Sequence, residues 1–318
     1  MKAIGVNRFG GPEVLEVVEL PEPQPGPGEV RVRVSFVAVN PTDVLARSGG
    51  YGKRLDGQKP PYVPGMDAAG VIDAIGPGND GRLAVGERVI ALTSPILPSK
   101  GSYAQQIIVP AASAVRAPKG VELPAASTLL MNALTVRLGL DSLGLKPGQT
   151  LAITGSAGAV GGYAIQLAKA DGLRVLADVS DSPADRKLLT ELGADVLVPR
   201  GPGFTERVRK LEPKGVPGLF DGALLNGEAV PAIADCGGLV TVRGWSEPVE
   251  RGIRVLPVAV GTALKETAKL ERLRDQAESG VLTLRVAKVL PASQAAEAHR
   301  SLAAGGVRGR IVLDFGSL

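Results

Sequence analysis

The chain has 318 residues, which is longer than a single hydrophobic core usually serves and enough for two cores, so we expect two domains. Lys and Arg total 36 against 32 Asp and Glu, and no basic run gathers the net charge of +4, which argues against nucleic acid as a partner. The single cysteine, Cys236, excludes an internal disulfide and a thiolate-rich zinc site. The sequence shows no leader pattern and no long unbroken apolar run, so we expect a cytoplasmic protein without a membrane partner.

The first part of the chain predicts β-structure with many turns. Between residues 30 and 38, apolar side chains alternate with Arg and Ser, which is typical of a strand that buries one face. Short apolar runs follow at residues 68–75, 88–92 and 103–109, separated by turn residues. Several short strands at this spacing predict a compact β-rich domain, which we place at residues 1–120.

The pattern changes after residue 148, where short apolar runs begin to alternate with helical patterns. The predicted strands and the helices that follow them lie at residues 151–154 and 160–170, 174–180 and 184–192, 195–198 and 205–211, 219–225 and 229–236, with a last strand at 239–242. Strand and helix in alternation predict a doubly wound parallel sheet, which makes the fold class α/β. We place this second domain at residues 121–262.

The remaining residues, 263–318, predict two helices and one strand. The helices are expected at 264–279 and after Ser293, and the closing strand at 310–314. No internal repeat or low-complexity tract interrupts the chain. We expect this last segment to return to the first domain.

A glycine-rich loop joins the first strand and helix of the second domain. Its glycines are three residues apart, whereas the usual dinucleotide motif places the first two only two apart. The physical needs are the same: a turn tolerant of positive φ, backbone amides at a helix N-terminus for a pyrophosphate, and close helix–strand packing. The alternative is an ordinary strand-to-helix turn; a P-loop is excluded because no Lys followed by Ser or Thr is present. The position favours dinucleotide binding by seven residues: Gly155, Ser156, Ala157, Gly158, Ala159, Val160 and Gly161.

The choice between NADH and NADPH depends on the end of the second strand of this domain. Asp178 lies where an acidic residue would hold the ribose 2′-hydroxyl of NADH; the alternative is that it points elsewhere, because the strand ends two residues later at Ser180. With Ser180 at the tip, a 2′-phosphate has room and could pair with one of three cations: Arg186, Lys187 and Arg200. Asp181 and Asp185 oppose that pairing. We predict NADPH, with NADH left open.

Several separate motifs occur in order along the chain. They are Asn-Pro-Thr-Asp at 40–43, Pro-Gly-Met-Asp-Ala-Ala-Gly at 64–70, Gly-Glu-Arg-Val at 86–89, Ser-Tyr-Ala at 102–104, the glycine loop, and Gly-Val-Arg-Gly-Arg-Ile-Val-Leu at 306–313. With them the chain resembles, essentially end to end, the medium-chain dehydrogenase/reductase superfamily, and within it the zinc-independent quinone oxidoreductases. The resemblance implies a GroES-like catalytic domain, a Rossmann cofactor domain, an active site between them, and usually a homodimer.

The resemblance also speaks against zinc. Zinc alcohol dehydrogenases of this superfamily carry a cysteine ligand where this chain has Asn40, and a histidine ligand where it has Met66. Cys236 and His299 are the only residues of their kinds, so neither a catalytic nor a four-cysteine structural zinc is expected. His299 falls in the predicted last helix and is interpreted as structural.

The resemblance bears on the cofactor as well. It places Ser180 where NAD-specific members have their acidic residue, which supports NADPH. However, Asp185 falls where some NADPH-specific quinone reductases have a phosphate-binding Lys, and Arg200 replaces a Tyr that they use. The resemblance also implies that Thr135 contacts the nicotinamide end. Loops at strand ends are expected to line the cofactor with two more residues, Asn226 and Gly244.

Two residues are candidates for direct work on the substrate. Without a metal, hydride transfer suits an acceptor that delocalises the incoming negative charge, so modest hydrogen-bond donors suffice. Tyr51 is the candidate donor to the acceptor oxygen; the alternative is a partly buried tyrosine in a loop. Asn40 matches a position that orients substrate or nicotinamide; the alternative is a turn-forming Asn before Pro41.

The predicted function is a zinc-independent, NADPH-dependent oxidoreductase that transfers hydride to a quinone or another conjugated carbonyl. Its expected partner is therefore a small-molecule electron acceptor. One alternative is the reduction of 2-alkenal or enoyl double bonds. Another, of a different class, is an NADPH-binding sensor or interaction protein without turnover, because a fold and a cofactor site do not prove catalysis.

Overall fold

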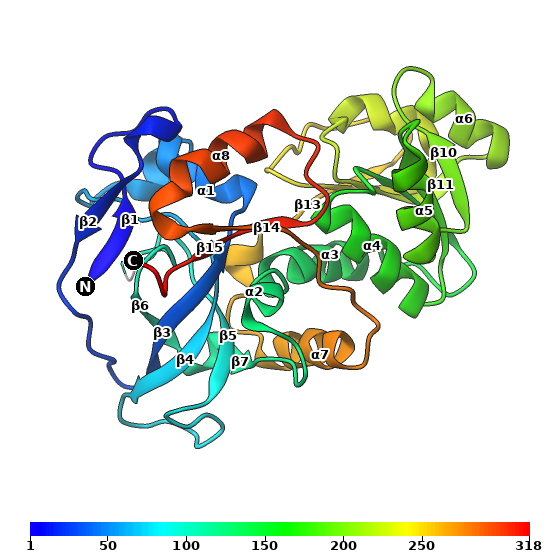
Figure 1. Cartoon of the computed structure of the whole chain (residues 1–318). Coiled ribbons are helices and arrows are strands. Elements are labelled where there is room, and N and C mark those ends of the chain that lie inside the picture. Colours follow the sequence, from blue (N-terminus) through cyan, green and yellow to red (C-terminus); the bar gives the residue numbers. More distant parts are fainter. Residues whose placement is uncertain (99) are drawn as a thin grey trace. The chain divides into compact units, whose positions relative to one another are not determined.

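The computed structural model describes residues 1–98 and 100–318, and this part of the chain forms two compact units (Figure 1). The first unit comprises Met1–Met131, Ala263–Ser279 and Leu284–Leu318, and the second comprises Asn132–Thr262 and Gly280–Thr283. The predicted α/β fold class is confirmed, because the first unit is β-rich and the second holds a parallel sheet with helices.

A seven-stranded sheet forms the first unit, in the order β14, β15, β3, β4, β5, β7, with β6 paired to β3. The strands are β3 Glu29–Ala38, β4 Asp67–Ile75, β5 Arg88–Leu92, β6 Gln106–Pro110, β7 Ala114–Arg116, β14 Val286–Pro291 and β15 Arg310–Asp314. β1 (Lys2–Gly5) and β2 (Glu16–Glu19) form a separate antiparallel pair. β15 pairs antiparallel with β3, Val312 opposite Ala38, so the last strand of the chain lies beside one of the first (Figure 1).

Helix α1 (Pro41–Ser48) of the first unit starts directly after β3. Pro41 occupies its first turn, where a missing N–H costs no hydrogen bond, and the helix ends at Gly49 with a left-handed φ of 79°. The other helices of this unit are α2 Leu123–Ala126, α7 Thr267–Glu278 and α8 Ala295–Ala304, with 3-10 turns at Pro12–Val14, Gly52–Leu55, Ala111–Ser113 and Ala292–Gln294. α8 packs against β15 and against the Pro12–Val14 turn.

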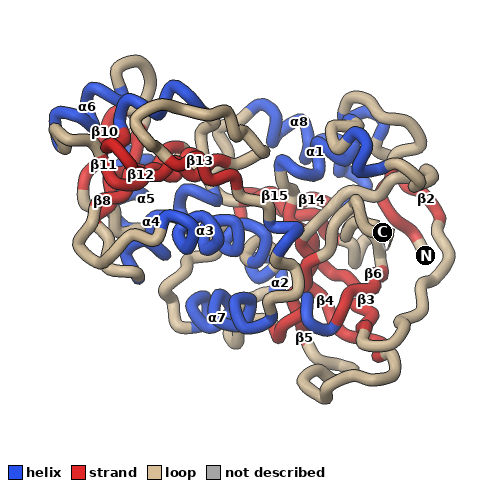
Figure 2. The backbone as a smooth tube through the Cα atoms, turned by 180° about the vertical axis from the view of Figure 1, so that it is seen from behind, coloured by secondary structure: helices blue, strands red, loops and turns tan. Residues whose placement is uncertain are grey.

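The second unit is built on six parallel strands in the order β10, β9, β8, β11, β12, β13. Figure 2 labels β8, β10, β11, β12 and β13 of this sheet. The strands are β8 Thr150–Thr154, β9 Arg174–Val179, β10 Val196–Pro199, β11 Val216–Asp221, β12 Ile233–Thr241 and β13 Arg254–Pro257. The helices are α3 Leu130–Leu143, α4 Ala159–Ala170, α5 Pro183–Glu191 and α6 Phe204–Leu211, with 3-10 turns at Asn226–Ala232 and Val260–Thr262. Counted along the chain, the strand order is 3-2-1-4-5-6, that of a doubly wound dinucleotide-binding sheet. The order reverses between β8 and β11, and such sheets bind ligands outside the carboxyl ends of the strands at that point.

Two of the differences from the prediction have a clear physical reason. The predicted helix at residues 229–236 is wrong, because the 3-10 turn Asn226–Ala232 precedes β12, which begins at Ile233. Pro231 lies within that turn, and a proline interrupts an α-helix by removing a backbone donor. Helix α3 is not expected from the sequence, because apolar residues surround its axis and no single face marks a 3.6-residue period.

Among the described residues, one helical segment, 123–143, has the length and composition to cross a membrane, with a mean hydropathy of 1.2. The tested window of this segment is 72% buried, and the core helix of a protein passes the same test, so this evidence for a membrane span is weak.

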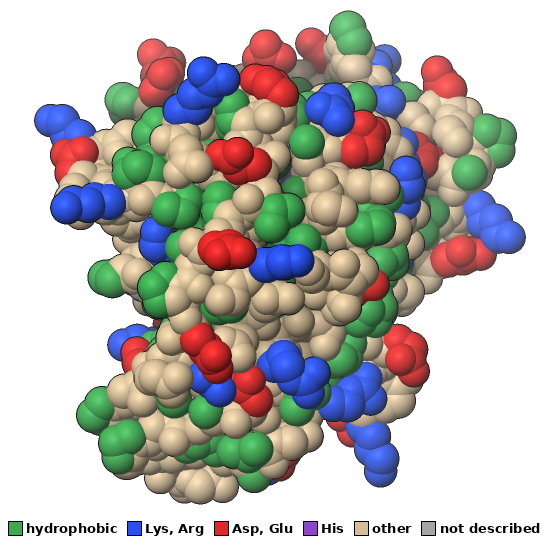
Figure 3. Space-filling view, turned by 60° about the vertical axis from the view of Figure 1, so that its left-hand side comes forward, with side chains coloured by type: hydrophobic (Ala, Val, Ile, Leu, Met, Phe, Trp, Pro, Cys, Tyr) green, Lys and Arg blue, Asp and Glu red, His purple; other side chains and the backbone are tan. Residues whose placement is uncertain are grey.

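On the face of the molecule drawn in Figure 3, acidic and basic side chains are interspersed, and neither kind forms a large patch.

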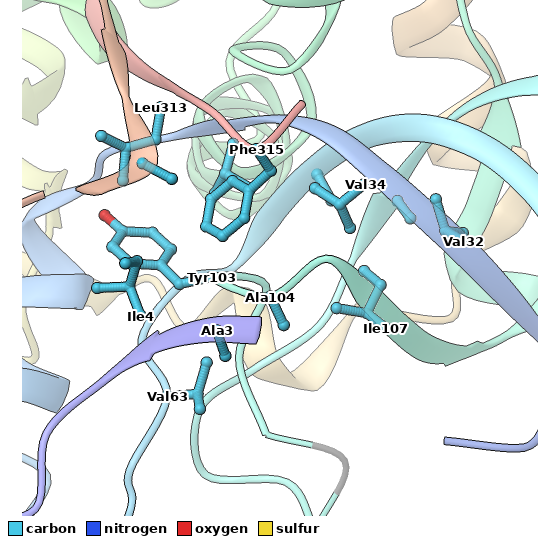
Figure 4. Packing of buried hydrophobic residues seen from close by; sticks show 14 of the residues in the cluster. Ala3, Ile4, Val32, Val34, Val63, Tyr103, Ala104, Ile107, Leu313 and Phe315 are labelled. Atoms are coloured by element: carbon cyan, nitrogen blue, oxygen red, sulfur yellow. The ribbon is translucent and has the colours of Figure 1, made fainter. Parts of the chain in front are cut away.

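Each unit has its own buried core. In the first unit, alternation along β3 directs Val32 and Val34 inward, where Tyr103 and Phe315 also pack (Figure 4). In the second unit, neighbouring strands contribute residues such as Leu176, Leu219 and Leu239. Burial of an apolar side chain of this size stabilises a fold by about 1.5–3 kcal/mol. The first core combines residues from near both ends of the chain.

Candidate active site

The loop between β8 and α4 meets strict backbone demands at two of its three glycines. Gly155 has a φ of +68°, and a Cβ there would lie 2.8 Å from the carbonyl carbon of Gly222. A Cβ on Gly161 would lie 2.2 Å from the carbonyl oxygen of Gly155, so α4 packs directly on the turn. Gly158 is the N-cap of α4, with a φ of −71° that any residue can adopt. The N-terminus of α4 therefore lies at the carboxyl end of β8, where backbone amides and the helix dipole stabilise a pyrophosphate.

Asp178 closes this loop from the neighbouring strand β9. Its buried carboxylate accepts a hydrogen bond from the backbone N–H of Ser156, with N and Oδ1 2.7 Å apart. The Ser156 hydroxyl donates to the carbonyl oxygen of Ile153 at 3.0 Å. The carboxylate of Asp178 thus points into the turn, which is the alternative that the sequence left open, and it is already engaged there.

Ser180 follows directly after β9, beside the end of β10. Its hydroxyl donates a hydrogen bond to Asp185, whose carboxylate is buried at the start of α5. The backbone N–H of Arg200 donates to the carbonyl oxygen of Val179 at 2.9 Å, which places Arg200 next to Ser180 across the sheet. The small neutral side chain and the cation that the sequence singled out are therefore neighbours.

The three candidate cations differ in their surroundings. Lys187 Nζ lies 3.8 Å from Glu191 Oε1, one turn along α5. Arg186 and Arg200 are exposed, and within residues 1–98 and 100–318 neither side chain has an ion-pair partner. The two arginines thus carry positive charge that no acidic side chain of the described chain neutralises at contact.

Sequence reasoning missed Asp221, which ties the ends of β8 and β11 together. Its fully buried Oδ1 accepts hydrogen bonds from the Thr154 hydroxyl at 2.5 Å and the Ala223 N–H at 3.2 Å, and its Oδ2 accepts from the Asn226 N–H at 2.6 Å. The loop that follows is held at the point where the strand order reverses, with left-handed φ at Leu224 and Asn226. The available signal was an acidic residue that ends an apolar strand and directly precedes a glycine.

Asn226 has an unmet hydrogen-bonding atom in this loop. Its side-chain Oδ1 is buried and has no partner among the described residues. A buried acceptor without a donor is costly, so this oxygen is suited to a donor from a bound ligand. Thr135 lies buried on α3, and Gly244, with a φ of +81°, lies in the turn after β12. The residues of the second unit therefore fit a dinucleotide.

In the first unit, Asn40 is the fully buried N-cap of α1. Its backbone N–H donates to Asp43 Oδ2 at 2.7 Å, and the Asp43 N–H donates back to the Asn40 side chain in a capping box. Its Nδ2 donates to Asp67 Oδ2 at 3.0 Å, and Asp67 Oδ1 accepts the Met131 N–H at 2.8 Å. Both ends of the Asn40 amide are thus engaged, and they tie the start of α1 to β4.

This arrangement does not fit zinc. The Asn40 amide is engaged with its neighbours, and Met66, which is also buried, is not one of the residue types that hold zinc. Within the described chain, no group of three or more His, Cys, Asp or Glu is placed to hold a metal ion. Zinc independence stays a prediction.

Tyr51 follows the C-terminal end of α1 and is partly buried. Burial, and then the negative charge of Asp43, raise the pKa of its hydroxyl above the ordinary value. Tyr51 therefore stays protonated at neutral pH and is able to donate a hydrogen bond. The two candidate catalytic residues flank the same helix: Asn40 caps its start and bonds to Asp43, whereas Tyr51 follows its end and is affected by the charge of Asp43.

The titrating groups of the first unit are carboxyls rather than the histidine. Burial raises the pKa of both Asp43 and Asp67 to about 7, against the opposing effect of hydrogen bonds from Asn40. His299 is fully buried, and burial, followed by the charge of Arg47, lowers its pKa to about 3. Near neutral pH the two aspartates therefore change charge while His299 remains neutral.

The fold and loop geometry define the class: an α/β protein of dehydrogenase type, with one β-rich unit and one dinucleotide-binding unit. The family model for the alcohol dehydrogenase GroES-like domain matches residues 26–119, and the model for zinc-binding dehydrogenase matches residues 192–313. The quinone oxidoreductase of Pongo abelii is 28% identical over 330 residues, which cover 98% of this chain and 97% of that protein.

Two solved structures are similar over nearly the whole chain. An NAD-dependent alcohol dehydrogenase is 31% identical, with a TM-score of 0.87 and coverage of 99% of this chain and 100% of that one. A mycobacterial protein complexed with NADPH is 30% identical, with the same TM-score of 0.87 and coverage of 99% and 100%. The chain therefore belongs to the medium-chain dehydrogenase/reductase superfamily, in its quinone oxidoreductase-like branch, and is an oxidoreductase of that type. The resemblance drawn from the motifs is confirmed, and NAD(P)H binding is supported.

Proposed function

We propose that this protein is a zinc-independent, NADPH-dependent oxidoreductase that transfers hydride to a quinone or another conjugated carbonyl. The observation that carries the proposal is Asn40, whose amide is bonded to Asp43 and Asp67 where zinc alcohol dehydrogenases have a cysteine ligand. An acceptor that needs no Lewis acid is one whose own conjugation spreads the arriving charge. The similarity to a quinone oxidoreductase supports an acceptor of this class.

Bound NADPH would supply the hydride, and the residues of each unit would position the reactants. In the second unit, the backbone of residues 155–161 would hold the pyrophosphate, and Asn226 Oδ1 would accept a hydrogen bond from the cofactor. In the first unit, Tyr51 donates a hydrogen bond to the acceptor oxygen as negative charge develops there. Because burial and Asp43 keep Tyr51 protonated, it acts as a neutral donor. The reduced acceptor would leave with the hydride from NADPH and one proton taken up from solvent, because Tyr51 keeps its own proton.

The neighbouring positions of Ser180 and Arg200, just after the ends of β9 and β10, favour NADPH over NADH; the Arg200 N–H bonds to Val179, the residue before Ser180. The carboxylate of Asp185, which would oppose a phosphate, accepts a hydrogen bond from Ser180. Arg200→Ala should weaken NADPH binding about tenfold and NADH binding less than twofold, because only NADPH carries the 2′-phosphate. Lys187→Ala, which removes a cation already beside Glu191, is the matched control. Tighter binding of NADH than NADPH in fluorescence titrations of the wild type would overturn this choice.

Steady-state NADPH oxidation with a panel of quinones and 2-alkenals tests the reaction itself. We expect turnover with quinones, and Tyr51→Phe should lower kcat about 100-fold with unchanged NADPH affinity, because one donor to the developing charge is lost. Tyr62→Phe is the matched control, since Tyr62 stacks on Phe9 with ring centroids 4.7 Å apart. Turnover with 2-alkenals alone would indicate double-bond reduction instead. Binding of NADPH without oxidation by any acceptor would contradict the proposal and indicate a sensor.

We also propose that the partner is a small-molecule electron acceptor, that the protein binds neither nucleic acid nor membrane, and that it is a cytoplasmic homodimer. The mixed charge of the face in Figure 3 supports the absence of a nucleic-acid partner. Light scattering coupled to size-exclusion chromatography tests the dimer, and a single monomeric mass across micromolar concentrations would contradict it.

A further inference from the structure

A network of buried hydrogen bonds links helix α1 to helix α8 in the first unit. The Tyr103 hydroxyl donates to Asp43 Oδ2 at 3.1 Å, and the same hydroxyl lies 3.2 Å from Nε2 of His299 on α8. Asp43 Oδ2 also accepts the backbone N–H of Asn40 at 2.7 Å. All four side chains are fully buried, so water does not compete for these bonds. The ring of Tyr103 is fixed by the core around it, which includes Ile4, Leu313 and Phe315 (Figure 4).

The Tyr103 hydroxyl has one proton, so it can donate a hydrogen bond either to Asp43 or to His299, but not to both. When Asp43 is ionised it only accepts, so the hydroxyl proton lies toward Asp43, and His299 must carry its proton on Nε2 and donate it to the phenol oxygen. When Asp43 is protonated, it donates to the phenol oxygen, and the hydroxyl proton turns to His299, whose proton then lies on Nδ1. The charge of Asp43 and the tautomer of His299 are therefore coupled.

Nothing else among the described residues fixes the tautomer of His299. Its Nδ1 is buried and has no hydrogen-bond partner there. Because the pKa of His299 is lowered to about 3, the imidazole changes its tautomer and not its charge near neutral pH. Asp43, whose pKa is raised to about 7, changes its charge in that range. The charged or titratable groups around the network are Asp67 on β4, Arg310 on β15, Arg47 on α1, and Tyr51.

We propose that His299, Tyr103 and Asp43 form a proton relay that sets the charge beside Tyr51, which makes His299 and Tyr103 positioning residues. In balance, the three groups together gain one proton: His299 gains it at Nδ1 and passes its Nε2 proton to the Tyr103 oxygen, and the Tyr103 proton passes to Asp43. Because Nδ1 is buried, the proton enters from solvent when the surrounding structure opens locally. Loss of the negative charge on Asp43 makes the Tyr51 hydroxyl a stronger donor, because that charge opposes ionisation of the tyrosine. The part that concerns Tyr51 rests on the proposed function; the relay itself does not.

The relay is tested directly by the single histidine of the chain. Because His299 is the only histidine, [15N]histidine labelling of tag-free protein yields one imidazole in a long-range 1H–15N spectrum. We expect a neutral ring from pH 5 to 9, with the Nε2–H tautomer dominant at high pH and the Nδ1–H tautomer increasing below about pH 7. Asp43→Asn and Tyr103→Phe should each abolish this pH dependence. A constant tautomer ratio in the wild type, or an imidazole that protonates near its ordinary pKa of about 6.5, would overturn the relay.

Kinetics tests the link from the relay to Tyr51. In the wild type, kcat should fall above about pH 7, as Asp43 ionises. Tyr103→Phe removes a hydrogen bond to the ionised carboxylate and should move this midpoint upward by about one pH unit, with KM for NADPH within about twofold. His299→Leu should shift it in the same way, whereas His299→Gln retains an N–H donor and should keep the wild-type midpoint. An unmoved midpoint in both Tyr103→Phe and His299→Leu would overturn the link.

Two controls separate this role from a purely structural one. Phe315→Leu perturbs the same core, with its ring centroid 6.4 Å from that of Tyr103, and should lower Tm without moving the midpoint. The pKa of Asp67 is also raised to about 7, so Asp67→Asn is the second control. If the kcat midpoint persists in this variant, the midpoint belongs to Asp43; if the midpoint disappears, the assignment to Asp43 is overturned. If the wild type reduces no acceptor, the proposed function fails, and the histidine spectra still decide the relay.

Discussion

The two units hold their candidate site residues by different means. In the second unit, the backbone is shaped by missing side chains, with a left-handed turn at Gly155 and a close helix approach at Gly161. In the first unit, side chains bond one another out of solvent, as Tyr103 does with Asp43 and Asn40 does with Asp67. A backbone site is therefore sensitive to added atoms, whereas a side-chain network is sensitive to lost ones.

The largest effect is expected where an atom is added to the backbone site. In Gly161→Ala the new Cβ would lie 2.2 Å from the Gly155 carbonyl oxygen, so α4 must move away from the turn. We expect NADPH affinity to fall at least about 100-fold and the free energy of unfolding to fall by about 3 kcal/mol. Gly158→Ala, where φ is −71° and the Cβ would lie 3.1 Å from the same oxygen, is the control. Fluorescence titration and urea unfolding measure both variants, and equal NADPH affinities would refute the contrast.

A smaller effect is expected at Asp221, which uses side-chain acceptors to hold the backbone of the second unit. Asp221→Asn turns one acceptor oxygen into a donor that faces the N–H of Asn226 or the hydroxyl of Thr154. We expect the free energy of unfolding to fall by about 2 kcal/mol, measured by urea denaturation. Asp235→Asn, on an exposed pair with Arg251, should cost less than about 0.5 kcal/mol. Similar losses of unfolding free energy in the two variants would show that the hydrogen bonds of Asp221 contribute little to stability.

The effect that is most specific to the first unit concerns pH. Burial raises the folded pKa of Asp67 to about 7, whereas an Asp in an unfolded chain titrates near about 3.9. Between these values the folded state retains a proton that the unfolded state has lost, so the stability from Asp67 falls as pH rises from about 4 to about 7.

Asp67→Asn removes that dependence. The variant should therefore gain at least about 1 kcal/mol relative to the wild type between pH 4.5 and pH 8, on top of a constant loss from its altered hydrogen bonds. Urea unfolding of both proteins at the two pH values measures the difference. A difference that does not change with pH would mean that Asp67 titrates normally in the folded protein.

The contrast between the units also explains how far the sequence could predict them. Alternating strands and helices, and glycines at fixed spacing, record backbone geometry directly, so the sheet and the 155–161 turn of the second unit were predictable. The turn before β12 was not, because Pro231 interrupts a stretch whose composition otherwise suits a helix. Asp221 escaped notice because one acidic residue after a strand has many possible roles.

The first unit was predictable only in part. The Asn-Pro-Thr-Asp motif marks the capping box of α1, which is a local device with a local pattern. The contact between Tyr103 and His299 joins residues 196 positions apart, and no periodicity records such a pair. The raised pKa values of Asp43 and Asp67 arise from burial by distant segments, so they depend on the tertiary fold alone.

The pairing of β15 with β3 has a consequence for synthesis on the ribosome. Residues 36–38 cannot meet their partners at 312–314 until residue 314 has been translated. At roughly 5–20 residues per second, that edge of β3 waits on the order of 10–60 seconds, while the contiguous residues 132–262 are able to fold in the meantime. A nascent or truncated chain therefore exposes an open strand edge, which is where we expect chaperones to bind and aggregation to begin.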